Sequence, residues 1–161
     1  MIGILNLIIA AGFLAIIYGY IVGTQILSAS PGNAKMQDIA SAIQEGARAY
    51  LNRQYKTITI VGVIILVIIT FALGTWVGLG YFIGAFLSGT AGYVGMLVSV
   101  QANVRTTEAS RKGLSGGLNI AFKSGAVTGM LVAGLALLAI AIYYSILLKI
   151  NIDNREIINA L

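Results

Sequence analysis

Long apolar runs alternate with short polar connections along this chain of 161 residues. Residues 2–27 and 57–104 carry no charge, and residues 124–148 form another apolar run. A helix needs about 20 apolar residues to cross a hydrocarbon core, so the middle run is long enough for two crossings. Gly74, Gly78 and Gly80 place the turn between these crossings at about residues 74–78. The pattern predicts an all-α integral membrane fold in which four transmembrane helices form part of a larger helix bundle. The crossings are expected over about residues 2–27, 57–75, 79–104 and 118–148.

The first polar connection is predicted to be an amphipathic helix over about residues 34–56, with Asn33 as its N-cap. At 100° per residue, its apolar side chains share one face, namely Met36, Ile39, Ala40, Ile43, Ala47, Tyr50 and Leu51. This face either lies on the membrane surface or packs on other helix ends. The opposite face carries both charge signs, including a predicted pair of Glu45 with Arg48, which favours packing on protein. Neither Pro nor Gly lies between Ala47 and Ile60, so the helix can continue into the second crossing.

The third connection begins as an extension of the third crossing, because residues 104–112 contain no helix breaker. Glu108 is spaced to pair with Arg111 and Lys112. Three glycines, at positions 113, 116 and 117, are expected to break the helix, and Ser115 is a candidate cap for a helix that starts near Leu118. No Gly-Lys-Ser/Thr sequence follows and no strand precedes, so the glycines favour a hinge over a phosphate cradle.

Composition and charge agree with a membrane protein. Hydrophobic residues make up 58% of the chain and charged residues only 9%, against about 25% in soluble domains. The net charge is +5. The basic residues of the first connection are Lys35, Arg48, Arg53 and Lys56, and those of the third are Arg105, Arg111, Lys112 and Lys123. The positive-inside rule makes both connections cytoplasmic and places both chain ends outside. Basic residues grouped at helix ends, rather than on a polar folded surface, argue against nucleic-acid binding.

The chemistry available to the chain is limited. It has no Cys and no His, which excludes disulfides, thiolate metal sites and a histidine base. Its acids are Asp38, Glu45, Glu108, Asp153 and Glu156. No charge lies in the middle of a crossing, which disfavours a self-contained transporter and a rotor-ring subunit. Arg105 and Lys112 could contact an anionic substrate, but membrane orientation and snorkelling are the expected roles of such residues at helix ends.

Small residues recur every four positions on two crossings, and we expect these stripes to pack helices closely together. The stripe on the third crossing is Gly80, Gly84, Ser88 and Gly92, and that on the fourth is Gly125, Gly129 and Ala133.

Three blocks of sequence resemble the membrane-embedded ion-pumping pyrophosphatases. Residues 43–58 read IQEGARAYLNRQYKTI, residues 92–110 read GYVGMLVSVQANVRTTEAS, and residues 121–129 read AFKSGAVTG. The resemblance follows the family's order over nearly the whole chain and is similar to the first four of about sixteen helices. It implies the outer ring of a pump that hydrolyses pyrophosphate at a cytoplasmic Mg²⁺ site and exports a proton or sodium ion, with K⁺ as a possible further cofactor.

The resemblance also implies partners, namely the remaining helices of the pump, the lipid bilayer and a second copy in a homodimer. The family's substrate cradle and ion gate lie on later helices, and its Asp-Val-Gly-Ala-Asp-Leu-Val-Gly-Lys-type motif is absent here. We therefore assign no catalytic, substrate-binding, ion-gating or metal-binding residue, and expect the chain to be inactive alone. It would be a truncated gene product or a prepared piece of one.

Two other interpretations remain open. The chain could be a stand-alone four-helix membrane protein that serves as a scaffold or assembly subunit. It could also anchor a peripheral enzyme, although the sequence contains no soluble domain to be anchored.

Overall fold

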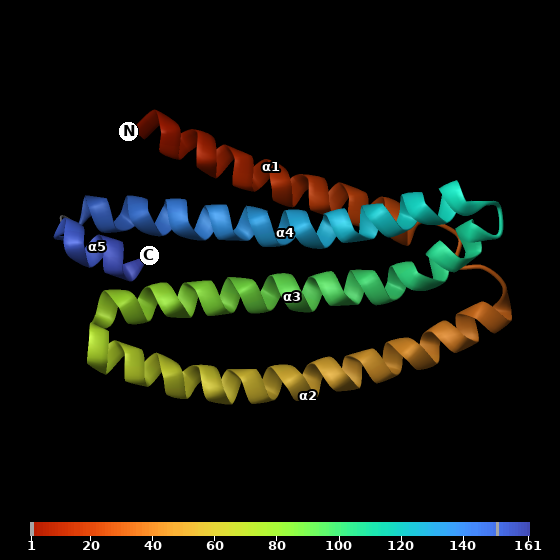
Figure 1. Ribbon diagram of the computed structural model, residues 1–161, viewed down its shortest axis with the longest axis horizontal. Helices are drawn as coiled ribbons and strands as arrows, with labels where there is room; N and C mark the ends of the chain where they lie inside the picture. The colour runs from red at the N-terminus through yellow and green to blue at the C-terminus, as the bar shows by residue number, and fades with distance from the viewer. Residues whose placement is uncertain (1, 151) are drawn as a thin grey trace.

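The computed structural model describes residues 2–150 and 152–161, which form five helices and no strand. The helices are α1 (Ile2–Leu27), α2 (Ala34–Leu73), α3 (Thr75–Ser110), α4 (Leu114–Lys149) and α5 (Asn154–Ala160). Helices α1 to α4 are each long and apolar enough to cross a membrane, so the predicted all-α membrane fold class is confirmed. Both chain ends lie at one end of the bundle, and the α1–α2 and α3–α4 connections lie at the other (Figure 1).

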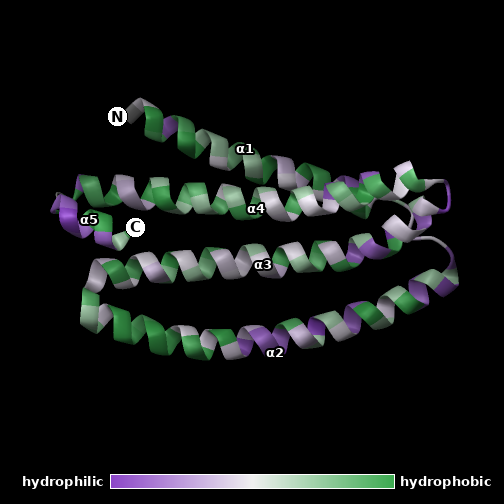
Figure 2. Cartoon of the chain, viewed as in Figure 1, coloured by the Kyte–Doolittle hydropathy of each residue, from purple (hydrophilic) through white to green (hydrophobic). Residues whose placement is uncertain are grey.

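Helix α2 joins the predicted amphipathic segment to the second crossing in one helix of 40 residues. Asn33 is its N-cap, as predicted, because the Asn33 side chain accepts a hydrogen bond of 3.0 Å from the Met36 backbone N–H. Within the apolar face of the amphipathic part, Ala40 and Leu51 are buried, whereas Ile39 and Ile43 are more than half exposed. Most of this face is therefore uncovered by the rest of the chain. In Figure 2 the polar residues of α2 continue into the middle of the helix, and the apolar crossing follows them.

The turn between α2 and α3 is shorter than predicted, because Gly74 alone separates the two helices. Its φ of +102° is a conformation that side chains with a Cβ rarely adopt. Gly78 does not form part of the turn. It lies buried in the first turn of α3, where an added Cβ would collide with the side chain of Thr70.

The start of α4 also differs from the prediction. The helix begins at Leu114 rather than near Leu118, and its N-cap is Gly113 with φ +129° rather than Ser115. Gly116 and Gly117 are helical instead of forming a hinge. A Cβ added at Gly116 would lie 2.9 Å from the backbone oxygen of Ala109, so the missing side chain lets α4 pack closely on the end of α3.

The core lies along α4, which packs against both α1 and α3. Val22, Ile26, Ala102 and Val127 form a buried cluster where these three helices meet. Two glycines bring the backbones together. A Cβ at Gly95 would lie 2.7 Å from the Thr128 side chain, and one at Gly134 would lie 2.9 Å from the Gly12 oxygen.

The predicted small-residue stripes are not the main packing surfaces within this chain. A Cβ added at Gly84, Gly125 or Gly129 would meet nothing within 4 Å. Two members of the stripe on α3 do make contacts: Gly80 lies under the end of α5 and beside Tyr143 of α4, and Gly92 lies under Tyr55 of α2. Much of each stripe is therefore open in this chain. Spacing alone did not reveal this, because packing depends on which face of a helix its neighbours cover.

Helix α5 lies beyond the last of the four predicted crossings and was not predicted. It folds back over the end of the bundle, where Ile157 and Ala160 join Tyr143 and Leu147 in a buried cluster. Trp76 packs against this cluster. The Tyr143 hydroxyl donates a hydrogen bond of 2.5 Å to the Trp76 backbone oxygen and so ties α4 to the start of α3.

Candidate functional site

Arg105 connects the two polar connections at one end of the bundle. Its Nε–H and Nη2–H donate hydrogen bonds of 3.2 and 2.9 Å to the backbone oxygen of Leu27, the last residue of α1. Its Nη1–H donates to the Gln101 oxygen at 2.7 Å. The carbonyl groups at the end of a helix lack partners and carry partial negative charge, so a guanidinium group stabilises them. Arg105 is therefore a structural cap for α1, a role that the local sequence does not reveal.

Glu108, one turn further along α3, faces the turn that follows α1. Its carboxylate lies so close that a Cβ added at Gly32 would be 3.0 Å from Glu108 Oε2. The same oxygen accepts a hydrogen bond of 3.1 Å from Arg111 Nη1, which confirms one of the two predicted partners of Glu108. Lys112 is exposed. Arg105 and Glu108 thus hold the two connections together instead of pointing into a shared anion site.

The carboxylates of the described residues do not form a metal centre. No group of three or more His, Cys, Asp or Glu residues in residues 2–150 and 152–161 could hold a metal ion. Asp38 and Glu45 are exposed on α2, and the predicted pair of Glu45 with Arg48 is not among the ion pairs of the described residues. A Mg²⁺ site for pyrophosphate needs several convergent oxygen ligands, so these residues do not fit one.

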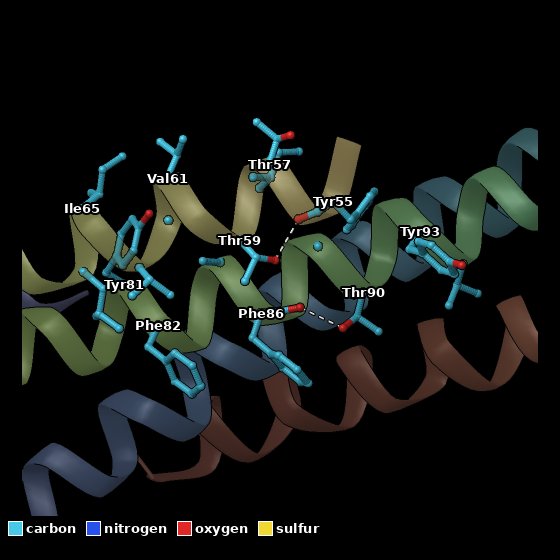
Figure 3. Close-up of a pocket in the computed structure, with 17 residues that line it drawn as sticks. Tyr55, Thr57, Thr59, Val61, Ile65, Tyr81, Phe82, Phe86, Thr90 and Tyr93 are labelled. Atoms are coloured by element: carbon cyan, nitrogen blue, oxygen red, sulfur yellow. Dashed lines mark hydrogen bonds between the residues drawn. The ribbon is translucent and has the colours of Figure 1, made fainter. Parts of the chain in front are cut away.

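A groove between α2 and α3 has a volume of about 700 Å³. Figure 3 shows side chains of both helices around it, with Tyr55 and Val61 on α2 and Tyr81 and Phe86 on α3. Most of its lining is aliphatic or aromatic, and several side chains, such as that of Phe86, are exposed. The groove therefore offers an apolar surface that this chain leaves uncovered.

Two contacts between a tyrosine and a glycine bound the groove. At one end, the side chain of Tyr55 on α2 packs against α3. A Cβ added at Gly92 of α3 would be 2.7 Å from the Tyr55 hydroxyl oxygen. The Tyr55 ring also meets the Tyr93 ring edge to face, with centroids 5.2 Å apart. At the other end, the Tyr81 hydroxyl oxygen is 3.7 Å from a Cβ built on Gly62. These rings act as spacers between the helices. The only signal of them in the sequence is the presence of aromatic residues on one helix and glycines on the next.

Comparison with protein families gives a match over nearly the whole chain. The family described as inorganic H⁺ pyrophosphatase matches residues 13–161. The match includes the groove, Arg105 and all of α2 to α5.

Curated relatives agree with that match. The chain is 46% identical over 136 residues to the K⁺-insensitive pyrophosphate-energized proton pump of Methanosarcina mazei. This match covers 83% of this chain and 20% of the relative. It is 39% identical over 150 residues to the putative K⁺-stimulated pyrophosphate-energized sodium pump of Bacteroides thetaiotaomicron, covering 88% of this chain and 20% of the relative. The chain thus spans about one fifth of the length of these relatives.

Proposed function

Because this chain belongs to the inorganic H⁺ pyrophosphatase family, we propose that it forms the outer-ring, N-terminal four-helix part of a pump that couples pyrophosphate hydrolysis to ion export. The observation that carries the proposal is the family match over residues 13–161. Relatives named as proton pumps and as sodium pumps are similarly close, at 46% and 39% identity, so the proposal covers both ions. The proposal also includes the cofactors and assembly of the whole pump. The pump would use Mg²⁺, could be either sensitive or insensitive to K⁺, and would form a homodimer.

The role proposed for this part of the pump is structural. The carboxylates of the described residues do not form a group that could hold a metal ion, and the guanidinium group of Arg105 is hydrogen-bonded to the end of α1. Electrostatic catalysis of phosphoryl transfer requires a preorganised set of cations around the phosphoryl oxygens. We therefore assign hydrolysis and ion transfer to helices outside this chain, and to this chain the support of those helices.

The proposal includes an orientation in the membrane. The α1–α2 and α3–α4 connections lie at the same end of the bundle. Eight of the ten basic residues lie in these connections or on the parts of the helices that lead into them, namely Lys35, Arg48, Arg53, Lys56, Arg105, Arg111, Lys112 and Lys123. Excess Lys and Arg mark the cytoplasmic side of a membrane protein. The connections are thus proposed to be cytoplasmic, and the chain ends with α5 to be outside.

Complementation tests the proposed function. The Methanosarcina mazei pump would be produced without the fifth of its length that this chain matches, either alone or together with this chain. Transmembrane helices that are stable independently can assemble after insertion. We expect Mg²⁺-dependent pyrophosphate hydrolysis and proton uptake by vesicles only when both parts are present. Restored assembly without any restored turnover would contradict a role in the pump and favour the alternative of a separate scaffold.

The isolated chain provides the matching control. Purified in bilayers with Mg²⁺ and pyrophosphate, it should release no phosphate above the level of empty vesicles. Hydrolysis that survives removal of contaminating soluble enzymes would show that the chain contains a catalytic site, contrary to the proposal.

A further inference from the structure

We propose that the groove between α2 and α3 binds one acyl chain of an anionic phospholipid, with the lipid phosphate beside Arg53 and Lys56. The groove is a defined hollow of about 700 Å³, within the usual range of ligand pockets. It lies along the apolar part of α2, and the rest of the chain buries none of the residues in the most apolar stretch of this helix. A surface of this kind, within a helix long enough to cross a membrane, is open to lipid in this chain.

The length of the groove matches one leaflet of a bilayer. Its lining runs from Tyr55 to Leu66 on α2 and from Tyr81 to Val94 on α3. At 1.5 Å per helical residue, these stretches are about 17 and 20 Å long. Half of a hydrocarbon core is about 15 Å thick. One extended acyl chain in the leaflet on the side of the basic residues can therefore lie along the whole groove.

Charge at one end of the groove determines the headgroup. Arg53 lies one helical turn before Thr57, whose side chain lines the groove, and Lys56 lies three residues before Thr59, which also lines it. Residues three or four apart share a face of a helix, so both basic residues lie on α2 within one turn of this end of the groove. The two acidic residues of α2, Asp38 and Glu45, lie at least two turns further from the groove. This end of the groove is thus positively charged and complements a phosphate that carries net negative charge.

Neutral polar groups at the same end suit a headgroup as well. The Tyr93 hydroxyl donates a hydrogen bond of 3.2 Å to Asn52 Oδ1, next to Arg53 in the sequence. The Thr57 and Thr59 hydroxyls donate to backbone oxygens of their own helix, at 3.2 and 2.8 Å. Below this level the lining is almost entirely apolar. The groove therefore has the polarity of a phospholipid, with a polar and basic end followed by an apolar length.

Quenching of tryptophan fluorescence by brominated lipid tests the proposal. The chain has one tryptophan, so Trp76→Phe gives a silent background in which Phe86→Trp reports from the groove. The full chain would be reconstituted in bilayers that contain brominated phosphatidylglycerol or brominated phosphatidylcholine. We expect phosphatidylglycerol to quench Trp at position 86 at about fivefold lower mole fraction, and Arg53→Gln with Lys56→Gln to abolish this preference.

Phe71→Trp in the same background is the matched control, because Phe71 is 89% exposed on α2 and does not line the groove. Both lipids should quench this tryptophan equally. Phe82→Trp is a second reporter in the groove if Phe86→Trp reduces the helical circular dichroism signal. Equal quenching by the two lipids at positions 82 and 86 would overturn the proposal. So would the absence of quenching by either lipid, which would mean that protein fills the groove.

Discussion

Arg105 binds the end of a helix that precedes it by 78 residues: its guanidinium group donates two hydrogen bonds to the backbone oxygen of Leu27. The arrangement satisfies one of the carbonyl groups left without a partner where α1 stops. It also connects α1 to α3, two helices that otherwise make few contacts with each other, since each packs mainly against α4.

Arg105→Gln should therefore destabilise the bundle. Loss of two charge-assisted hydrogen bonds at a partly exposed site is expected to lower the free energy of unfolding by about 1–2 kcal/mol. Arg105→Lys should recover only part of this loss, because an ammonium group lacks the planar fork of donors. Unfolding in a graded detergent mixture, followed by circular dichroism, measures both effects.

Arg111→Gln is the control for Arg105. It removes the same charge from α3, but Arg111 is 60% exposed and its ion pair with Glu108 is a local contact within one helix. Such pairs contribute about 0.3–0.5 kcal/mol. If Arg111→Gln destabilised the chain as much as Arg105→Gln, the cap on α1 would not be the cause.

Gly134→Leu should disrupt the packing of α1 on α4. The added side chain would begin 2.9 Å from the Gly12 backbone oxygen and 3.0 Å from the Ala15 Cβ, so the helices must move apart. Overpacking of this kind costs about 1–3 kcal/mol. Gly129→Leu makes the same change on the same helix at a position with nothing within 4 Å, and should leave the stability of this chain unchanged. The same unfolding assay compares the two variants, and equal losses would contradict the packing of α1 on α4 described above.

Ile157→Ser should release α5 from the end of the bundle. Ile157 is 2% exposed and packs with Leu147, whereas its neighbour Ile158 is 74% exposed. Burying a serine hydroxyl among apolar side chains costs free energy, and the helix of seven residues has few other contacts to hold it. Hydrogen exchange over residues 154–160 should become at least about tenfold faster in Ile157→Ser, a change of about 1.4 kcal/mol. Ile158→Ser should exchange like the parent chain.

Single cysteines can establish the orientation in the membrane, because the chain contains none of its own. Ala49→Cys and Ser110→Cys should react with an impermeant maleimide only from the cytoplasmic side, and Asn159→Cys only from the other side. All three positions are exposed, so lack of access would not arise from burial within the chain. Reaction of positions 49 and 110 from opposite sides would be incompatible with the four-helix arrangement.

Much of the fold could be predicted because it depends on local patterns. The uncharged runs predicted the four long helices, and Asn33 marked the start of α2 because capping involves only the next few residues. Glycine was harder to interpret, since the same residue serves as a turn at Gly74 and as a packing contact at Gly116. Only the position of the neighbouring helix distinguishes the two roles.

The candidate sites depended on contacts between distant residues and could not be predicted in the same way. Arg105 was interpreted as an orienting charge because its acceptor is 78 residues away. The groove arises where Tyr55 and Tyr81 hold two helices apart, and neither helix alone contains it. Helix α5 was missed because a segment of seven residues shows too little periodicity, and its stability comes from the cluster around Leu147.

The unbroken course of α2 has a mechanical consequence. At 1.5 Å per residue, 40 residues form a rod about 60 Å long, twice the thickness of a hydrocarbon core. About half of this rod extends beyond the apolar crossing, and at its other end the chain turns into α3 at the single glycine at position 74. A tilt of about 10° at that pivot would carry the far end, near Asn33, through about 10 Å. A straight rod of this length therefore relates a small tilt at one face of the membrane to a large displacement at the other.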